Sequence, residues 1–449
     1  MATAASAAGI VVRLRDAGFE TYLAGGCVRD RLLGRAAADY DIATAARPEQ
    51  VARLFPRTVE IGAAFGVVRV VADDGEYEVA TFRTEGPYLD GRRPSSVDYA
   101  GPREDALRRD FTINGLFFDP ATGTVLDFVG GRADLDARVV RAIGDAAMRF
   151  EEDRLRMLRA VRLAAELGFT IAPETFDAVR AHADGVRGTS AERIRDELVR
   201  MLTGPAPARA LGLLRDTGLL RVVLPEVAAE IGVPQPQNFH PEGDVFEHTR
   251  LTVAALRDPS PALAMAALLH DAGKPATLEY APDRIRFSRH DELGAEITRT
   301  VMERLRFARR DVDRVEALVA RHMVFKDLPQ MREAKRRRLF ADDLFLDLVE
   351  LHRADCEASH RDLSLYEWAR AEAARIREAP PVPARLVTGG DVLARGVPAG
   401  PRVGAILEAV EDARLEGRVR TRDEALALLE TLAAEPAGGA SRAAGGGDR

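Results

Sequence analysis

The stretch Gly25-Gly26-Cys27-Val28-Arg29-Asp30 decides the fold of the first part of this chain. It follows a short apolar run, Thr21 to Ala24, which predicts a β-strand, and the residues from Val28 to Leu33 predict a helix. Glycines let a phosphate approach the backbone closely, and the N–H groups at a helix N-terminus attract anions. The turn at Gly25 and Gly26 therefore predicts a cradle for a triphosphate.

Three carboxylates follow this turn. Asp39 and Asp41 are separated by one residue, so in a strand both side chains would lie on the same face. Glu78 lies in a second β-like run, Tyr77 to Phe82, and Glu76 has the same parity and competes for the third position. Hard oxygen ligands of this kind suit Mg²⁺. A glycine turn or an acidic pair alone fits an ordinary surface, but together they favour nucleotidyl transfer.

Six ordered motifs between residues 22 and 162 extend this pattern. They are Gly25-Gly26-x-x-Arg29-Asp30, Asp39-x-Asp41, Glu78-Val79-x-Thr81-Phe82-Arg83, Asp90-Gly91-Arg92-Arg93-Pro94, Arg108-Arg109-Asp110-Phe111-Thr112-Ile113-Asn114 and Glu152-Asp153-x-x-Arg156. The series resembles the family of class II CCA-adding tRNA nucleotidyltransferases and bacterial poly(A) polymerases. The resemblance implies template-independent addition of nucleotides to RNA, with tRNA, CTP and ATP as partners.

The resemblance also implies roles for single residues. Asp39, Asp41 and Glu78 would hold two Mg²⁺ ions, Arg109 would bind a phosphate, and a ribose-binding pair would complete the site. That pair is Asp110 and Asn114. The tRNA would be recognised at its acceptor arm through shape and phosphate contacts, as A-form RNA usually is. The basic run 335–338 is one candidate contact, although a solvated face explains it equally well.

Asp153 and Arg156 are candidates for selecting the base. In a helix beginning at Asp153 they would lie on one face at i and i+3, presenting an acceptor beside a forked donor. Cytosine and adenine each offer an amino donor next to a ring-nitrogen acceptor, whereas uracil and guanine place a carbonyl opposite the carboxylate. That mismatch should cost several kcal/mol, or roughly 10³-fold in discrimination. An ordinary surface ion pair is the alternative interpretation.

Arg159 and Arg162 continue at helical spacing from Arg156. Three arginines at i, i+3 and i+6 predict a phosphate-facing stripe, and a solvated basic face is the alternative.

The product depends on two further segments. A loop with a motif such as Asp90 to Pro94 accompanies the switch from CTP to ATP in the resembling enzymes, so its presence favours complete CCA addition. Poly(A) polymerases of the family carry a basic segment where this chain has Ile61 to Val67, which again favours the tRNA enzyme. Poly(A) polymerase, or an enzyme that adds only CC or only A, remains the alternative.

A second site is predicted by the histidines of the central region. His270-Asp271 ends an apolar helix, and together with His248 upstream it resembles the HD metal-dependent phosphohydrolase domain. Further candidate ligands are His290, His322 and Asp355. Mixed histidine and aspartate ligands suit a divalent transition metal. Such a site would hydrolyse phosphomonoesters or 2′,3′-cyclic phosphates, unless the domain is kept only as a scaffold.

Length and composition fit a multidomain enzyme of 449 residues. We expect an α+β nucleotidyltransferase head followed by an all-α neck, a helical HD insertion, a body and a tail. The predicted boundaries are 1–148 for the head, 149–235 for the neck, 236–365 for the HD domain, 366–435 for the body and tail, and 436–449 for a disordered end. Two cysteines and the lack of a long apolar run predict a cytoplasmic protein without membrane contact. A net charge of −7 restricts RNA contact to local basic patches.

Overall fold

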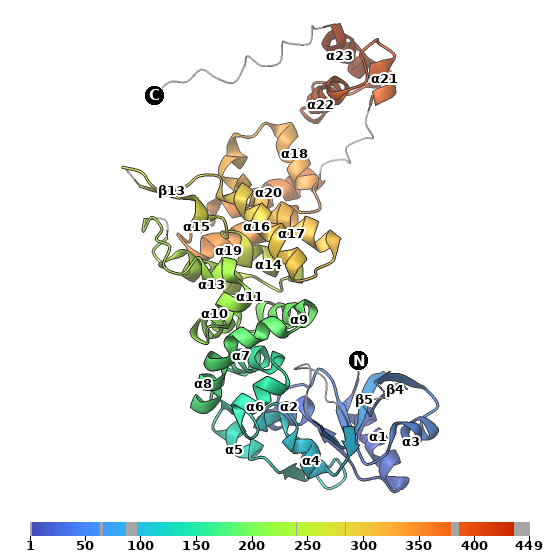
Figure 1. Ribbon diagram of the computed structural model, residues 1–449. Helices are drawn as coiled ribbons and strands as arrows, with labels where there is room; N and C mark the ends of the chain where they lie inside the picture. Colours follow the sequence, from blue (N-terminus) through green and yellow to red (C-terminus); the bar gives the residue numbers. More distant parts are fainter. Residues whose placement is uncertain are drawn as a thin grey trace.

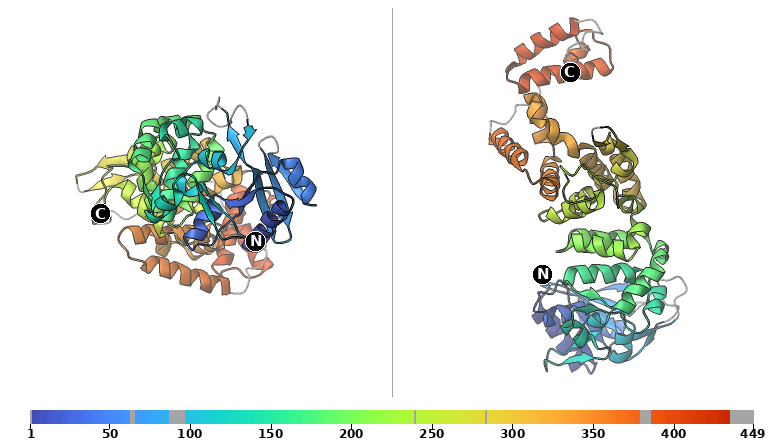
Figure 2. Two further views of the ribbon diagram at one scale, coloured as in Figure 1. Left: turned by 90° about the horizontal axis from the view of Figure 1, so that it is seen from below. Right: turned by 90° about the vertical axis from the view of Figure 1, so that its left-hand side faces the viewer.

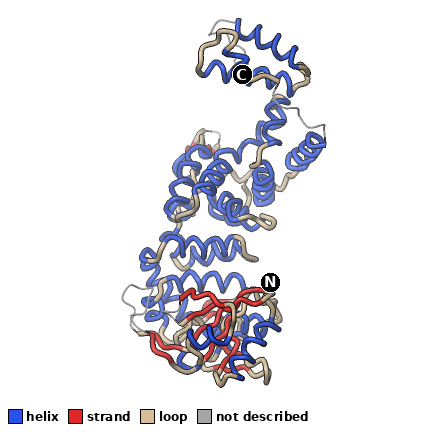
Figure 3. The backbone as a smooth tube through the Cα atoms, turned by 90° about the vertical axis from the view of Figure 1, so that its right-hand side faces the viewer, coloured by secondary structure: helices blue, strands red, loops and turns tan. Residues whose placement is uncertain are grey.

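The computed structural model describes residues 2–62, 66–86, 97–238, 240–282, 284–378 and 386–434. The molecule is elongated, with an α/β head at one end, a helical middle and a separate group of helices at the other end (Figure 1). The right-hand view of Figure 2 shows the same succession from another side. Strands gather at the head end, and the rest of the described chain is almost entirely helical (Figure 3). The predicted fold class is confirmed.

Seven strands form the main sheet of the head, in the order β3-β4-β5-β2-β1-β8-β9. Their bounds are β1 (Thr21–Ala24), β2 (Asp41–Thr44), β3 (Thr58–Gly62), β4 (Val67–Ala72), β5 (Gly75–Thr81), β8 (Leu116–Phe118) and β9 (Val125–Asp127). Only β2 and β5 are parallel to each other, and the other neighbouring strands are antiparallel. The strand predicted at Thr21 to Ala24 is confirmed.

Helices close the head on both faces of this sheet. α1 (Ala4–Asp16) and α3 (Pro48–Leu54) pack on one face together with part of α7, and the smaller cluster on the other face includes Ala106 of α4 (Pro102–Leu107). The remaining elements of the head are α2 (Gly26–Leu32), β6 (Arg83–Glu85), β7 (Val97–Tyr99), η2 (Thr112–Asn114), α5 (Gly131–Asp136) and β10 (Val139–Val140). The loop predicted to switch nucleotides, Asp90 to Pro94, lies outside the described residues, as does part of the segment from Ile61 to Val67.

The neck is helical, as predicted, but one of its helices begins later than expected. Its elements are α6 (Ala146–Glu152), α7 (Leu155–Leu167), β11 (Thr170–Ile171), α8 (Pro173–His182), η3 (Ala183–Gly188), α9 (Ala191–Leu202), α10 (Pro207–Asp216), α11 (Leu219–Val223) and α12 (Pro225–Ala228). The expected helix from Asp153 is wrong at its start. Asp153 has extended backbone angles (φ −142°, ψ 103°), and its Oδ1 accepts the N–H of Leu155 at 3.1 Å, so α6 ends there and α7 begins.

The middle of the molecule is a helical domain that shares its hydrophobic core with the neck. The elements are α13 (Val245–Ala255), α14 (Pro261–Leu269), α15 (Lys274–Thr277), β12 (Leu278–Tyr280), β13 (Ile285–Phe287), α16 (His290–Arg304), α17 (Arg309–Arg321), η4 (His322–Gln330), α18 (Glu333–Ala341), α19 (Phe345–Ala358) and α20 (Ser364–Glu378). One continuous cluster of buried side chains runs from Ala142 in the head–neck junction to Ala373 in α20. The structure therefore places α20 with this core, beyond the predicted boundary near residue 365.

Three C-terminal helices form a small unit with its own apolar core. They are α21 (Gly389–Leu393), α22 (Pro401–Leu415) and α23 (Arg422–Ala434). In the basic run 335–338, Arg337 pairs with Glu333 at 2.7 Å, and Arg338 pairs with Asp412 of α22, so these two arginines hold protein carboxylates. None of the helices in the described ranges is both long and apolar enough to cross a membrane. The predicted disordered end, 436–449, lies outside these ranges.

Candidate functional sites

The turn between β1 and α2 brings the backbone close to two functional side chains. Gly25 has a φ of 75°, a left-handed conformation that favours glycine. A Cβ at this position would lie 3.0 Å from Nη1 of Arg109 and 3.4 Å from Oδ2 of Asp41. Glycine therefore leaves open the space between a cationic and an anionic side chain.

The predicted carboxylates meet on neighbouring strands. Asp41 is the first residue of β2 and lies directly opposite Glu78 of β5 in the parallel ladder. Glu76 lies opposite Val71 instead and pairs with Arg69 at 2.8 Å, so Glu78 is the third carboxylate of the group. The prediction that one strand carries both aspartates is wrong, because β2 begins only at Asp41 and Asp39 precedes it.

The proximity of these carboxylates affects the pKa of Asp41. Burial is the main cause that raises the pKa of Asp41 to about 6, and the nearby carboxylates of Glu78 and Asp39 contribute to the same increase. Arg109 and Arg159 act in the opposite direction on the same pKa. Carboxylates held together against their mutual repulsion, with hard oxygen donors, form a group suited to a divalent cation.

A chain of hydrogen bonds links the turn to the neck. Arg29 of α2 donates to Oδ1 of Asn114 at 2.8 Å, and Nδ2 of Asn114 donates to Asp110 at 3.1 Å. Asp110 in turn accepts from Nε of Arg159 in α7 at 2.8 Å. Burial opposes ionisation of Asp110, but Arg159 and Asn114 hold its pKa below the usual value. Four of the predicted nucleotide-binding residues thus form one network across three elements.

Arg109 is held at the other side of the turn. Its guanidinium pairs with the buried Asp105 at 3.0 Å and lies over the ring of Phe117, 5.1 Å from the centroid. Sequence reasoning did not identify Asp105, which fixes this arginine beside Gly25.

The two predicted base-reading residues are held by different partners. Both oxygens of Asp153 accept hydrogen bonds from Arg193 of α9, at 3.0 and 2.8 Å. Arg156 donates to Glu152 at 2.6 Å and to the backbone oxygen of Arg108 at 3.1 Å. Because α7 begins after Asp153, the pair does not share a helical face. Arg193 was missed, since its position 40 residues downstream gives no local signal.

The predicted arginine stripe is paired with acids along its length. Arg156 contacts Glu152, Arg159 contacts Asp110, and Arg162 contacts Glu197 at 2.6 Å and Glu166 at 3.0 Å. Asp110 is the main cause of the raised pKa of Arg159, and Asp153 also contributes to it. Arg159 is thus within electrostatic reach of both Asp153 and Asp41.

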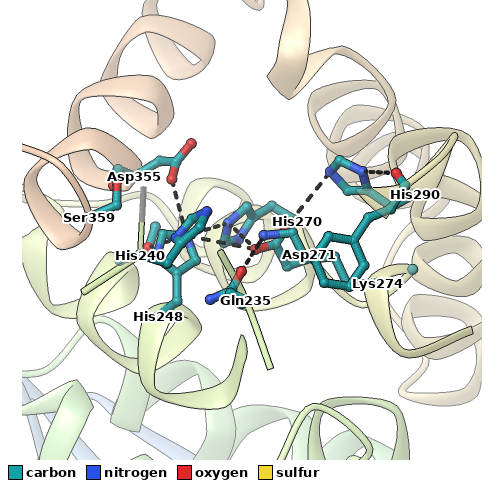
Figure 4. Close-up of polar contacts among 12 residues, drawn as sticks. Gln235, His240, His248, His270, Asp271, Lys274, His290, Asp355 and Ser359 are labelled. Carbon is teal, nitrogen blue, oxygen red and sulfur yellow. Dashed lines mark hydrogen bonds and ion pairs between the residues drawn. The ribbon is translucent and has the colours of Figure 1, made fainter. Parts of the chain in front are cut away.

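The second site brings all six predicted ligands together in the helical middle domain, and Figure 4 labels five of them. His248 lies on α13, His270 and Asp271 follow α14, and the others come from α16, η4 and α19. Two groups of three share Asp271: His248 with His270, and His290 with His322. The ligand atoms in each group lie within 4.8 Å of one another, so the cluster offers two adjacent positions for a metal ion.

Each histidine is oriented by its Nδ1 atom. Nδ1–H groups donate to backbone oxygens at 2.9 Å for His270, 2.9 Å for His290 and 2.7 Å for His322. Nδ1 of His248 instead meets the carboxylate of Glu242 at 2.7 Å. These bonds leave the Nε2 lone pairs facing the cluster, which is the arrangement of metal-binding histidines.

The Nε2 atoms face one another at short distance. They are 3.3 Å apart in the pair of His248 and His270 and 3.2 Å apart in the pair of His290 and His322. Two lone pairs this close repel unless a proton or a cation lies between them. The residues therefore fit a divalent metal site.

The surroundings shift the pKa values of two cluster histidines in opposite directions. Burial would lower the pKa of His248, but Asp355 at 3.0 Å and Glu242 raise it to about 9. Burial and the neighbouring His270 lower the pKa of His322 to about 4. Without a metal, His248 is therefore protonated at pH 7 beside its two acidic partners, whereas His322 is neutral.

Several cluster residues were not predicted. Lys274 is buried and lies 2.7 Å from Oδ2 of Asp271, and it also donates to Gln235 at 2.7 Å. Glu242 and His240 share a contact at 2.9 Å. Gln235 and His240 belong to the proline-rich segment 234–241. Both residues contribute side chains to one side of the site.

Three family models match the chain. The poly A polymerase head domain matches residues 21–141, the probable RNA and SrmB-binding site of polymerase A matches 168–231, and the HD domain matches 245–395. The HD match overlaps the predicted domain 236–365 and extends into the C-terminal helices.

Curated relatives are CCA-adding enzymes. The one from Lactobacillus gasseri is 33% identical over 429 residues, which cover 94% of this chain and 96% of that enzyme. The one from Geobacillus stearothermophilus is 46% identical over 225 residues, 50% of this chain, and the matched part spans only 55% of that relative's length. The stronger similarity is therefore confined to about half of either protein.

Solved structures of CCA-adding enzymes are also similar to this chain. The Bacillus stearothermophilus CCA-adding enzyme in complex with CTP is 31% identical and superimposes with a TM-score of 0.72, covering 95% of this chain and 96% of that one. The Thermotoga maritima CCA-adding enzyme complexed with tRNA is 19% identical, covers 95% of this chain and 94% of that one with a TM-score of 0.57, and so shares the fold.

Proposed function

The chain belongs to the family of CCA-adding enzymes, and we propose that it adds CCA to the 3′ ends of tRNA without a template, using CTP and ATP. The observation that carries the proposal is the pairing of Asp41 with Glu78 beside the left-handed Gly25, within electrostatic reach of Arg159. We expect this activity in the cytoplasm, where the proposed tRNA substrate is processed.

The head supplies the residues for nucleotidyl transfer. Asp39, Asp41 and Glu78 would hold Mg²⁺, which when bound supplies a Lewis acid for the attacking 3′-hydroxyl and the leaving pyrophosphate. Gly25 leaves room for the triphosphate beside Arg109. The network from Arg29 to Arg159 then holds Asp110 and Asn114 in place for the ribose.

Base selection is assigned to Asp153 and Arg156. Arg193 binds both oxygens of Asp153 and fixes the direction of the remaining lone pairs, which accept the amino group of cytosine or adenine. Glu152 holds the Arg156 guanidinium, so its remaining N–H groups can donate to the ring nitrogen.

The HD site supports a second activity, the hydrolysis of phosphate esters. His248, His270, Asp271, His290, His322 and Asp355 would hold a divalent transition metal, which when bound supplies an activated water. Lys274 stands 2.7 Å from Asp271 and offers a cation to the phosphate. The substrates expected are phosphomonoesters or 2′,3′-cyclic phosphates.

One double variant separates the two activities. In His270→Ala with Asp271→Ala, metal-stimulated hydrolysis of p-nitrophenyl phosphate should disappear while addition of CTP to tRNA continues. The reciprocal variant, Asp39→Ala with Asp41→Ala, should lose nucleotide addition and keep the hydrolysis. Unchanged incorporation in the reciprocal variant would reject the assignment of the transferase site.

A further inference from the structure

A cavity of about 780 Å³ adjoins the histidine cluster. Its walls come from Gln237, Asn238, Pro241 and Glu242, from α13, and from the end of α19 with the residues that follow. Glu242 lines it and also meets Nδ1 of His248 at 2.7 Å, and Ser359 lines it and donates to the backbone oxygen of Asp355 at 2.7 Å. Ser359 and His240 lie on the Asp355 side of the cluster, away from His290 (Figure 4).

None of the six predicted ligands lines the cavity itself, but Glu242 and Ser359 connect it to His248 and Asp355, and Asp355 is the most exposed of these ligands. The side chain of Asp355 is 28% exposed, whereas those of His248, Asp271 and His290 are exposed by 1%, 2% and 10%. A phosphate ester entering past Asp355 would therefore place its phosphate at the buried ligands and leave the rest of the molecule in the cavity.

The lining combines cationic and polar groups with an apolar wall, and its two carboxylates, Glu242 and Glu357, pair with His248 and Arg353. His360 and Arg361 are exposed at the rim, and Gln237 and Asn238 add amide groups opposite Leu251. The N–H of Asp362 donates to Nδ1 of His360 at 3.1 Å, so the neutral ring carries its proton on Nε2 as a donor.

The backbone of Arg361 is fixed at this rim. It has a φ of 61°, and its N–H donates to the carbonyl of Cys356 at 2.8 Å. An arginine at this position can bind an anion, the amides can hydrogen-bond to the edges of a nucleobase, and the apolar wall can contact the face of that base.

We propose that this cavity binds the nucleoside part of a phosphate ester hydrolysed at the histidine cluster, with Arg361 and His360 binding a second phosphate of the same substrate. The proposal rests on the proposed hydrolase function. Its substrate class is a 3′-phosphorylated ribonucleotide that also carries a 5′-phosphate, as at an RNA end. A water oxygen bonds to phosphorus, the ester P–O bond breaks, and the proton released by water passes to the leaving 3′-oxygen. The products are inorganic phosphate and a 5′-phosphorylated nucleoside.

Calorimetric titration with uridine 5′-monophosphate and guanosine 5′-monophosphate tests the cavity independently of catalysis. These probes are chosen because the base-reading pair of the head should reject uracil and guanine. Arg361→Gln should weaken their binding about tenfold, the effect of one lost charge-assisted contact. Ala254→Trp, at an exposed lining position of α13, should fill the cavity and abolish binding. The matched controls Arg310→Gln, at an exposed position of α17, and Ala371→Trp, at an exposed position of α20, should bind as the unchanged protein does.

The kinetic arm uses uridine 3′,5′-bisphosphate with the metal-loaded protein. Arg361→Gln should raise its KM about tenfold with little change in kcat. Equal affinities for the probes in Arg361→Gln and the unchanged protein would overturn the proposal, as would no binding to the unchanged protein at millimolar concentration. If the probes bind as expected but no phosphate ester is hydrolysed, the hydrolase function fails while the cavity stands as a nucleotide site.

Discussion

Arg193 fixes the carboxylate that is proposed to read the incoming base, so Arg193→Gln should impair base selection. The substitution removes both N–H contacts to Asp153, at 3.0 and 2.8 Å. Hydrogen bonds to charged groups contribute about 1.5 to 3 kcal/mol each when buried. These side chains are 26% and 18% exposed, so solvent screening reduces the combined effect to about 2 kcal/mol. That value corresponds to about 30-fold in kcat/KM.

The assay measures kcat/KM for CTP and for UTP on tRNA that lacks its terminus. A loose Asp153 should lower the value for CTP about 30-fold and the value for UTP much less, because uracil makes no bond to the carboxylate. Arg193→Lys, which keeps the charge but not the fork, should give an intermediate loss. Arg200→Gln, at an exposed position of α9, is the matched control and should change neither value. Parallel losses for CTP and UTP, with a lowered Tm, would refute a positioning role and indicate a structural one.

Three further predictions concern charge at the two sites. Asp41→Asn should lower nucleotide addition by about 10³-fold or more. At pH 8 without Mg²⁺, the same substitution should raise the free energy of unfolding by about 1 to 3 kcal/mol, as measured by urea titration. The sign follows because the pKa of Asp41 is raised to about 6, so its ionisation costs stability above that pH. A lower free energy of unfolding in Asp41→Asn would contradict the inference that ionisation of Asp41 destabilises the protein. Glu242→Gln should weaken metal binding about 10- to 100-fold in calorimetry, because Glu242 orients His248; unchanged affinity would exclude that role. Arg159→Gln should destabilise the protein more at pH 7 than at pH 3.5, and the two losses should differ by about 1 to 2 kcal/mol. Arg159 holds the pKa of Asp110 low, so the substitution leaves an ionised Asp110 without this partner at pH 7. An equal loss at both pH values, again from urea titration, would show that the ion pair is not the cause.

Local signals predicted the elements that position the transferase site. The apolar run Thr21 to Ala24 and the glycines after it gave β1 and α2, because strand propensity and glycine punctuation act within a few residues. The sequence grouped Asp41 with Glu78 as metal-binding carboxylates, but it did not predict that the two residues lie opposite each other. The two acids lie on adjacent parallel strands, and sequence periodicity does not specify which strands pair.

The break before α7 could not be read from periodicity. Polar residues at its start fit a continuous helix as well as a helix junction. What separates the two is the side chain of Asp153, which caps Leu155 and is bound by an arginine from α9. The histidines of the second site were predicted from a resemblance to the HD domain, whereas Glu242 and Gln235, which contact His248 and Lys274, belong to no motif that the sequence shows.

The most direct test of the account is the product formed on tRNA that lacks CCA. Purified protein is incubated with this RNA and with CTP, ATP, or both, in the presence of Mg²⁺, and the 3′ ends are sequenced. The account predicts addition of CC with CTP alone and of complete CCA with both nucleotides, with no extension beyond the final adenosine. Long adenosine tails added to arbitrary RNA from ATP alone would contradict it, and so would a product that stops at CC or gains only A.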